Sequence, residues 1–484
     1  MRIHAVCQPH GGCGVGDMVG IQIRASEGLA LTGVGGIALF GNLLERHTDF
    51  RSSFTAAFTK RRDGIPWGDV LLTYVASLAT GKSDFEAIRP WHGKSWVGKA
   101  LRISAVASPE TVRQHLDNLA DGHSHEALTL AGQASLDLLA RSKAPFTRCF
   151  SGHVPLDVDT TPQENGKTRK EGVSRTYMPG VDGFCPIFAF AGMEGWCINE
   201  AFRPGKQHSQ KGAPDFLRTS VRRLKSLGIE GIHTRMDAAF DASENYVLLR
   251  EEGSDFLIKG NLAHLRWDRW QAEAQALPKQ AWKRIGRNRR VAYLSRFEPR
   301  SFDGQEVQVR RILKVTKRLG WELKDVPPGQ RLLVKRWIVF EVETWVTSLD
   351  LPEADIVELY CQHATAEQYH SEIKSELDLT LDPCQRMRWQ GERMPSGSFK
   401  TNALVLRLGT LAYNALRLLG ILGKRVFRHR HPTQRRRLRT IIQELIYVPA
   451  RILTGSNQLK LDLGRDLFGR AAYLELWANL ARAA

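Results

Sequence analysis

The chain has 484 residues, of which 42% are hydrophobic and 25% are charged. This composition excludes a disordered chain and is enough for two to four domains with substantial cores. The chain contains 69 Lys and Arg residues against 51 Asp and Glu residues, a formal net charge of +18, which favours a polyanionic partner, either nucleic acid or an acidic membrane.

Cysteines and apolar runs indicate the compartment. The seven cysteines include no CxxC pair, so they predict neither a zinc site nor a disulfide framework, and we expect a reducing cytoplasm. The first residues lack the apolar region of a signal peptide. Of two apolar runs, residues 28–44 are Gly-rich and short for a membrane span, whereas residues 401–423 carry Arg407 and Arg417 and predict a buried amphipathic helix. A soluble protein without membrane contact is therefore expected.

The first 148 residues are predicted to be a mainly helical DNA-binding region. Within them, Ser108 is placed as an N-cap, and Pro109 occupies the first helical position. Val112, Leu116 and Leu119 follow at helical spacing. This helix is either the recognition helix of a helix-turn-helix or a surface helix of a bundle.

From Val154 onward the pattern changes to strands. Three apolar or alternating runs separated by Gly-rich turns predict an antiparallel meander. Helices and strands then alternate up to residue 262, which is typical of a mixed or parallel sheet. The order β-β-β-α-β-α-β predicts an α/β fold with a ribonuclease-H-like (retroviral-integrase-like) catalytic core, whose first part we place at residues 149–264.

The second half of the chain is predicted to complete this core around an insertion. Residues 265–345 read as a β-rich insertion, residues 346–420 as the last part of the core with one long helix after Pro352, and residues 421–484 as a basic, helical C-terminal region. The run 424–439 has eight basic residues and no acid, so it either holds DNA or is a solvated linker. The insertion's tryptophans, which either stack on a flipped base or pack the insertion, are Trp267, Trp270 and Trp282.

Two aspartates follow strands that are expected to be neighbours. Asp159 ends the first core strand and Asp237 the fourth, at a sheet edge where ligands collect. Two carboxylates about 4 Å apart repel by about 4 kcal/mol at an effective dielectric near 20. A divalent cation such as Mg²⁺ removes this repulsion. Alternatively, Asp237 caps the following helix.

The long helix carries a polar face. At about 100° per residue, its polar residues fall within about 60° of arc. They are Tyr360, His363, Glu367 and Lys374. Such a face is either functional or simply solvated.

Residues 360–374, "YCQHATAEQYHSEIK", resemble the Y-x2-R-x3-E-x6-K signature of insertion-sequence DDE transposases, with His363 in place of the family's Arg. "DTT" at 159–161, "RPGKQ" at 203–207 and "RMDAAFDASEN" at 235–245 are similar to further motifs of these enzymes. Residues 157–192 resemble the insertion-sequence thirteen-eighty family, which is related to the insertion-sequence four group. The resemblance covers residues 150 to 460.

The resemblance implies that Asp159, Asp237 and Glu367 are the catalytic residues and bind two Mg²⁺ ions, which Mn²⁺ can replace. It implies that four residues contact DNA: Tyr360, His363, Lys374 and Arg203. Asp157 and Thr160 would support the metal ligands from behind. A neutral imidazole at His363 has one donor where a guanidinium has a bidentate fork, so this departure weakens the expected phosphate contact.

We therefore predict a bacterial DNA transposase that binds double-stranded DNA at terminal inverted repeats as a homodimer and cleaves and transfers strands by a DDE mechanism. We expect it in the cytoplasm, on the nucleoid when bound to DNA. One alternative is a catalytically silent DNA-binding protein descended from a transposase. Another is a metal-dependent nuclease such as a junction resolvase, which would need neither the insertion nor the long N-terminal region.

Overall fold

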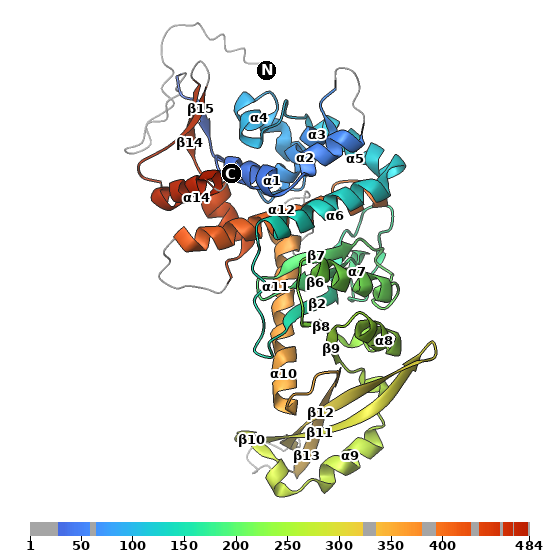
Figure 1. The fold of residues 1–484 in the computed structure, drawn as a ribbon. Helices are drawn as coiled ribbons and strands as arrows, with labels where there is room; N and C mark the ends of the chain where they lie inside the picture. Colours follow the sequence, from blue (N-terminus) through green and yellow to red (C-terminus); the bar gives the residue numbers. More distant parts are fainter. Residues whose placement is uncertain are drawn as a thin grey trace, which may run out of the picture.

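The computed structural model describes residues 28–58, 64–322, 335–379, 394–426, 435–454, 458–467 and 469–482. Figure 1 shows an elongated molecule with a helical part at one end, a mixed sheet in the middle and long β-hairpins at the other end. The predicted α/β class is confirmed, because one nine-stranded sheet combines parallel and antiparallel strands with helices between them.

The N-terminal part is mainly helical, as predicted. Its helices are α1 (Ile37–His47), α2 (Phe50–Ala57), α3 (Trp67–Leu78), α4 (Ser95–Leu101), α5 (Pro109–Gly122) and α6 (Ser124–Arg141), with a 3₁₀ turn, η1 (Phe85–Trp91), before α4. Helix α5 begins where the sequence places it, because the Ser108 hydroxyl accepts a hydrogen bond from the Thr111 backbone N–H at 3.1 Å. Its apolar face is buried and packs against α3 and α12 (Phe399–Val426). A role as recognition helix stays a prediction.

The central strands confirm the predicted order of elements. They are β2 (Val154–Thr160), β6 (Ile187–Ala191), β7 (Trp196–Ala201), β8 (Ile232–Met236) and β9 (Asp255–Lys259), with α7 (Ala213–Ser226) before β8 and α8 (Ser243–Glu251) before β9. The strands lie in the order β7-β6-β2-β8-β9, where β6 runs antiparallel to β2, and β8 runs parallel to it. Three short strands, β3 (Gln163–Glu164), β4 (Ser174–Arg175) and β5 (Asp182–Phe184), form a separate small sheet.

The predicted insertion is β-rich and continues the same sheet. It contains α9 (Trp267–Ala276), β10 (Lys283–Gly286), β11 (Arg289–Phe302), β12 (Gln305–Glu322) and β13 (Lys335–Thr347). Because β13 pairs antiparallel with β9, the long hairpins extend the central sheet instead of forming a separate one. Trp270 is buried, and the Arg296 guanidinium lies 3.9 Å from its ring centroid, so this tryptophan packs the insertion.

A helical segment next runs along the sheet toward the N-terminal helices (Figure 1). It consists of α10 (Glu353–Cys361), a 3₁₀ turn η5 (Gln362–Ala364), α11 (Thr365–Ser371) and a π-helical turn η6 (Glu372–Glu376). The sequence predicts a single helix, whereas the structure has a tighter 3₁₀ turn within it and a wider π-helical turn at its end. π-Helical turns are frequent at functional sites.

Helix α12 connects the helical part to the sheet by packing against α5, α6 and β7. It is long and apolar enough to cross a membrane, but 89% of its most apolar window is buried inside the protein, as expected for a core helix. After it come α13 (Leu438–Ile441), a π-helical turn (Ile442–Ile446), β14 (Ala450–Thr454), β15 (Leu459–Leu463) and α14 (Arg470–Arg482). The helical C-terminal region predicted from the sequence is wrong in this respect, because β14 pairs with β1 (Leu31–Thr32) near the start of the chain and β15 pairs with β14.

Candidate active site

Two aspartates lie side by side at the ends of neighbouring parallel strands. Val158 of β2 is in register with Met236 of β8, so Asp159 and Asp237 follow at the same edge of the sheet. Burial and the nearby Asp237 carboxylate raise the pKa of Asp159 to about 7, and burial raises the pKa of Asp237 above its usual range. Still, 26% of the Asp159 side chain is exposed, so a ligand can reach it.

Asp237 also caps the turn that follows it. Its side chain accepts a hydrogen bond from the Ala239 backbone N–H at 3.0 Å. The capping alternative is thus realised in the structure, and it fixes the carboxylate at the strand end beside Asp159. Capping and metal binding are compatible, because a carboxylate has lone pairs on both oxygens.

Behind these acids, Asp157 forms a buried network. Its carboxylate accepts two hydrogen bonds from Arg235, at 2.6 and 2.7 Å, and it lies 2.8 Å from Nδ1 of His363. Burial alone would raise the pKa of Asp157, but Arg235 and His363 lower it well below its usual range. Asp157 is therefore charged, and its contacts with Arg235 and His363 connect β2 to β8 and to the helical segment.

The parallel register explains how Arg235 reaches Asp157. The two residues are direct partners on β2 and β8, and both are 2% exposed. Arg235 was not predicted from the sequence. The sequence feature that could have identified Arg235 is its position in "TRMD", two residues before Asp237, which puts both side chains on the same face of an extended strand.

The helical segment presents further groups to this sheet edge. Burial has the largest effect on the pKa of Asp159 and raises it, whereas His363 and Lys374 both lower it. These two side chains therefore lie near the Asp159 carboxylate. Nε2 of His370 lies 3.8 Å from Asp159 Oδ2. Burial lowers the pKa of Lys374 below its usual range and that of His370 to about 3. Two residues of the predicted polar face, His363 and Lys374, therefore lie near the aspartates, and His370 is an unpredicted neighbour of Asp159.

Glu367 lies on the same helix, four residues after His363 and three before His370, which is one face of a helix. Its side chain is exposed on α11. Within the described ranges no three His, Cys, Asp or Glu side chains are close enough to hold a metal ion. The structure therefore brings Asp159 and Asp237 together, and it places Glu367 on the adjoining helix face without joining it to them.

The donor set nevertheless fits a divalent cation. Asp159 and Asp237 are hard oxygen donors of the type that Mg²⁺ prefers, and burial raises the pKa of both, with the Asp237 carboxylate adding to the effect at Asp159. A cation between them would supply the missing positive charge.

A buried ion cluster holds the π-helical turn in place. Glu372 accepts hydrogen bonds from Arg417 of α12 and, at 2.6 Å, from Arg435. Arg435 also lies over the Tyr369 ring, 4.5 Å from its centroid. Neither Glu372, at 0% exposed, nor Arg417, at 1% exposed, was identified from the sequence, because their partners come from distant parts of the chain.

This cluster changes the interpretation of the basic run 424–439. Residues 427–434 lie outside the described residues. Arg436 pairs with Glu444, and Arg437 pairs with Glu376 at 2.6 Å. Together with Arg435, these side chains bind acids of the protein itself, and Arg435 and Arg436 are largely buried, whereas the Arg437 side chain is 55% exposed.

Tyr360 lies near the C-terminal end of α10, before the 3₁₀ turn. Its ring contacts Trp345 of β13 and His363, with centroids 6.0 and 5.6 Å apart. Burial, with Asp237 and Asp159 nearby, raises the pKa of the Tyr360 hydroxyl well above its usual range, so it stays a neutral donor. Lys259 lies 5.7 Å from the Tyr360 ring centroid and provides a cation at this end of the site.

Arg203 and Thr160 stabilise the loops around Asp159. The Arg203 guanidinium is 5% exposed and donates to the backbone carbonyls of His208, Ser209 and Lys211, so its geometry does not support the predicted DNA contact. The Thr160 backbone N–H donates to Asp159 Oδ1 at 2.7 Å, and its hydroxyl lies 3.0 Å from that of Ser209.

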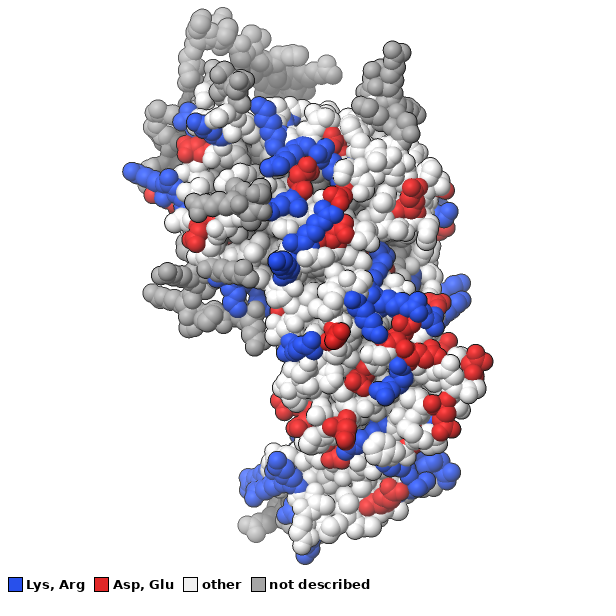
Figure 2. Space-filling view, viewed as in Figure 1, with Lys and Arg blue, Asp and Glu red and all other residues white. Residues whose placement is uncertain are grey.

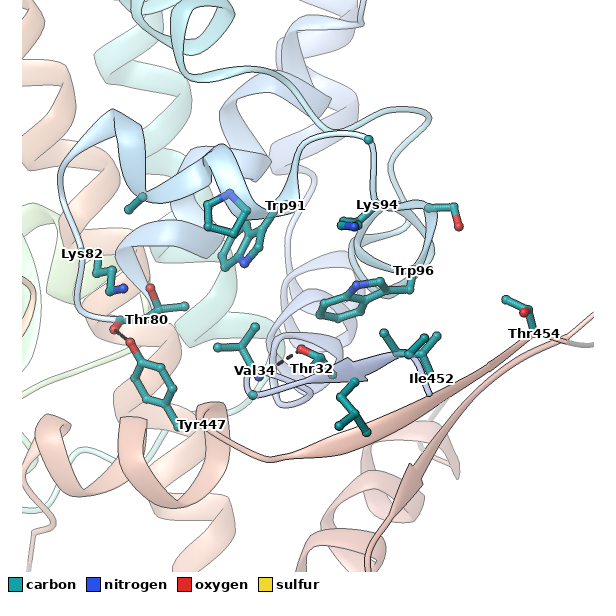
Figure 3. A pocket seen from close by; sticks show the side chains of 17 residues that line it. Thr32, Val34, Thr80, Lys82, Trp91, Lys94, Trp96, Tyr447, Ile452 and Thr454 are labelled. Atoms are coloured by element: carbon teal, nitrogen blue, oxygen red, sulfur yellow. Dashed lines mark hydrogen bonds between the residues drawn. The ribbon is translucent and has the colours of Figure 1, made fainter. Parts of the chain in front are cut away.

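Two surface features lie outside this site. Figure 2 shows Lys and Arg side chains over the helical part, the sheet and the hairpins alike, with Asp and Glu side chains between them. Figure 3 shows a pocket of about 690 Å³ beside β1, whose lining includes Trp91, Trp96 and Lys94. None of its lining residues is acidic or belongs to the site at the sheet edge, so it contributes no metal ligand.

Comparison with known proteins gives two similarities. A family model described as "Transposase DDE domain group 1" matches residues 18–484. A solved structure, "Cryo-EM structure of piggyBac transposase synaptic complex with hairpin DNA (SNHP)", is 12% identical, with 85% of this chain and 79% of that chain covered and a TM-score of 0.40. No curated protein matches the chain.

Proposed function

Because the chain belongs to the transposase DDE domain family, group 1, we propose that it is a DNA transposase that binds terminal inverted repeats and performs metal-dependent strand cleavage and strand transfer. The observation that carries this proposal is the pair Asp159 and Asp237 at adjacent strand ends, with Glu367 on the helix beside them.

In this proposal, Asp159, Asp237 and Glu367 hold two Mg²⁺ ions, for which Mn²⁺ can substitute. When bound, such ions activate the attacking oxygen and stabilise the leaving oxygen of a phosphodiester. The protein supplies the positioning. Asp237 is fixed by its cap, and Glu367, exposed on α11, would be the third acid of the set.

The groups around the acids have distinct roles. Asp157 and Arg235 keep the ends of β2 and β8 rigid, since their two hydrogen bonds join adjacent strands. Lys374 places a cation near Asp159, where it can bind a DNA phosphate, and Tyr360 donates its hydroxyl hydrogen. His363 already uses Nδ1 on Asp157, so only Nε2 is left for a phosphate or the site.

The finer classification is part of the same proposal. We propose that the strands β7-β6-β2-β8-β9 form a ribonuclease-H-like core and that the chain belongs to the insertion-sequence thirteen-eighty type of bacterial elements. The strand order, with β8 and β9 parallel to β2, and the motif over residues 360–374 support it. In this view the protein acts in the bacterial cytoplasm, as a homodimer that joins two transposon ends.

A catalytically silent, DNA-binding descendant is the second candidate. Its specific support is the position of Glu367, exposed and apart from the two aspartates, together with His363 in place of an arginine. The two candidates are distinguished by DNA cleavage, which the transposase performs and the silent descendant does not.

Cleavage at the element's own ends tests the proposal. Purified protein is incubated with a plasmid that carries the gene's flanking DNA, with and without Mg²⁺, and the breaks are mapped. Wild type is expected to cut at the element boundaries only with Mg²⁺, and Asp237→Ala to cut at neither end. The matched control is Asp215→Ala, an acid on α7 whose side chain is 88% exposed. Binding of the flanks without cleavage in Mg²⁺ and in Mn²⁺ would support the silent candidate instead.

A further inference from the structure

His370 is a buried imidazole whose nitrogens have no hydrogen-bond partner. The residue is 5% exposed, and neither Nδ1 nor Nε2 is hydrogen-bonded within the part of the chain that the structure describes. Leaving such a polar group buried and unpaired is unfavourable, and a bound ion would explain it.

The ring is held in one orientation by its neighbours. Phe188 and Phe190 contact it edge to face, with centroids 5.5 and 5.1 Å from the His370 centroid. This apolar packing disfavours a charged imidazolium, so one ring nitrogen keeps its lone pair. The orientation that results places Nε2 toward Asp159 Oδ2, at 3.8 Å.

That separation is too long for a hydrogen bond, and it lies between the separations expected of adjacent and of opposite ligands of one ion. Two donors that each lie about 2.1 Å from a cation are about 3.0 Å apart at a right angle and at most about 4.2 Å apart when opposite. His370 also stands three residues after Glu367, the i, i+3 spacing at which a Glu and a His on one helix share a metal site in carboxylate-bridged bundles.

We propose that His370 is a nitrogen ligand of the metal ion bound by Asp159, in addition to the three carboxylates. This inference rests on the proposed function, because it requires a metal at the two aspartates. A nitrogen donor suits Mn²⁺ better than Mg²⁺, which prefers oxygen ligands throughout. The site is therefore expected to bind Mn²⁺ more tightly than Mg²⁺.

Electron spin-echo spectroscopy of Mn²⁺ bound to the full chain tests the ligand directly, without activity as the readout. A directly bound imidazole produces nitrogen modulation, which changes when the protein is labelled with ¹⁵N-histidine. We expect this modulation in wild type and its loss in His370→Phe, whose ring can pack against Phe188 and Phe190. His370→Gln, which keeps a polar side chain, is expected to lose it as well.

The matched control is His363→Arg, which removes a second imidazole near the aspartates and restores the residue of the resembled motif; His208 is a further imidazole near Asp237. It is expected to keep the modulation. Mn²⁺ bound without nitrogen modulation, or modulation lost in His363→Arg and kept in His370→Phe, would overturn the inference while leaving the metal site intact. Failure of wild type to bind Mn²⁺ at all would overturn both the inference and the metal-dependent function.

Discussion

Removal of the charge of Glu372 is expected to destabilise the protein strongly. The Glu372→Gln substitution leaves Arg417, at 1% exposed, without its carboxylate, and deprives Arg435 of the same partner. Breaking a buried ion pair by removing one partner costs about 3–5 kcal/mol, because the other charge stays buried and uncompensated. The substitution should also disturb the active site, because Glu372 begins the π-helical turn that carries Lys374.

The free energy of unfolding, measured by urea denaturation with circular dichroism, checks this value. The control is Glu86→Gln, which breaks an exposed pair with Arg89 and should cost less than about 1 kcal/mol. A second substitution, Arg417→Met in the Glu372→Gln background, should recover part of the loss because it removes one of the unpaired charges. Equal, small effects of Glu372→Gln and Glu86→Gln would refute the reasoning that the cluster is buried and coupled.

Three further outcomes follow from buried groups elsewhere. Arg235→Met should cost about 3–5 kcal/mol of unfolding free energy in urea, because it leaves buried Asp157 without its two strongest donors, whereas Arg250→Met on the surface should cost under about 1 kcal/mol. Burial lowers the pKa of His233 to about 3. As the pH falls below about 6.5, His233 is therefore protonated in the unfolded chain but stays neutral in the folded protein. The free energy of unfolding of wild type should drop by about 2 kcal/mol from this group between about pH 7.5 and 5. In urea titrations at both pH values, His233→Gln should lack this part of the loss, and an unchanged difference would contradict it. Ser108→Ala should cost about 1 kcal/mol, by the same method, through loss of the helix cap of α5, and no change would show that the cap is dispensable.

Local patterns in the sequence predicted the central strands and the pair of aspartates well. Alternation and turn residues identify strands, and the order of elements then places Asp159 and Asp237 at one edge of the sheet. The cap at Ser108 is equally local. The strands and the cap depend on residues a few positions apart, whereas the pairing of Asp159 with Asp237 follows from the order of these local elements in the sheet.

The features that the sequence did not predict depend on partners far along the chain. Strand β14 pairs with β1, more than 400 residues earlier, so its short run reads as helix or loop in isolation. From the sequence alone, Arg435 is a candidate DNA contact, whereas in the structure it donates a hydrogen bond to Glu372. His370 lies on the predicted helix face, but only the contact with Asp159 distinguishes it from a core histidine.

The central claim is that Glu367 acts with Asp159 and Asp237 at one metal-dependent site. Cleavage of transposon-end DNA in Mg²⁺ by Glu367→Gln tests it most directly, with Glu358→Gln, an exposed acid on α10, as the matched control. We expect Glu367→Gln to bind the end DNA without cleaving it, and Glu358→Gln to cleave like wild type. Normal cleavage by Glu367→Gln would contradict the assignment of the third acid and with it the DDE mechanism.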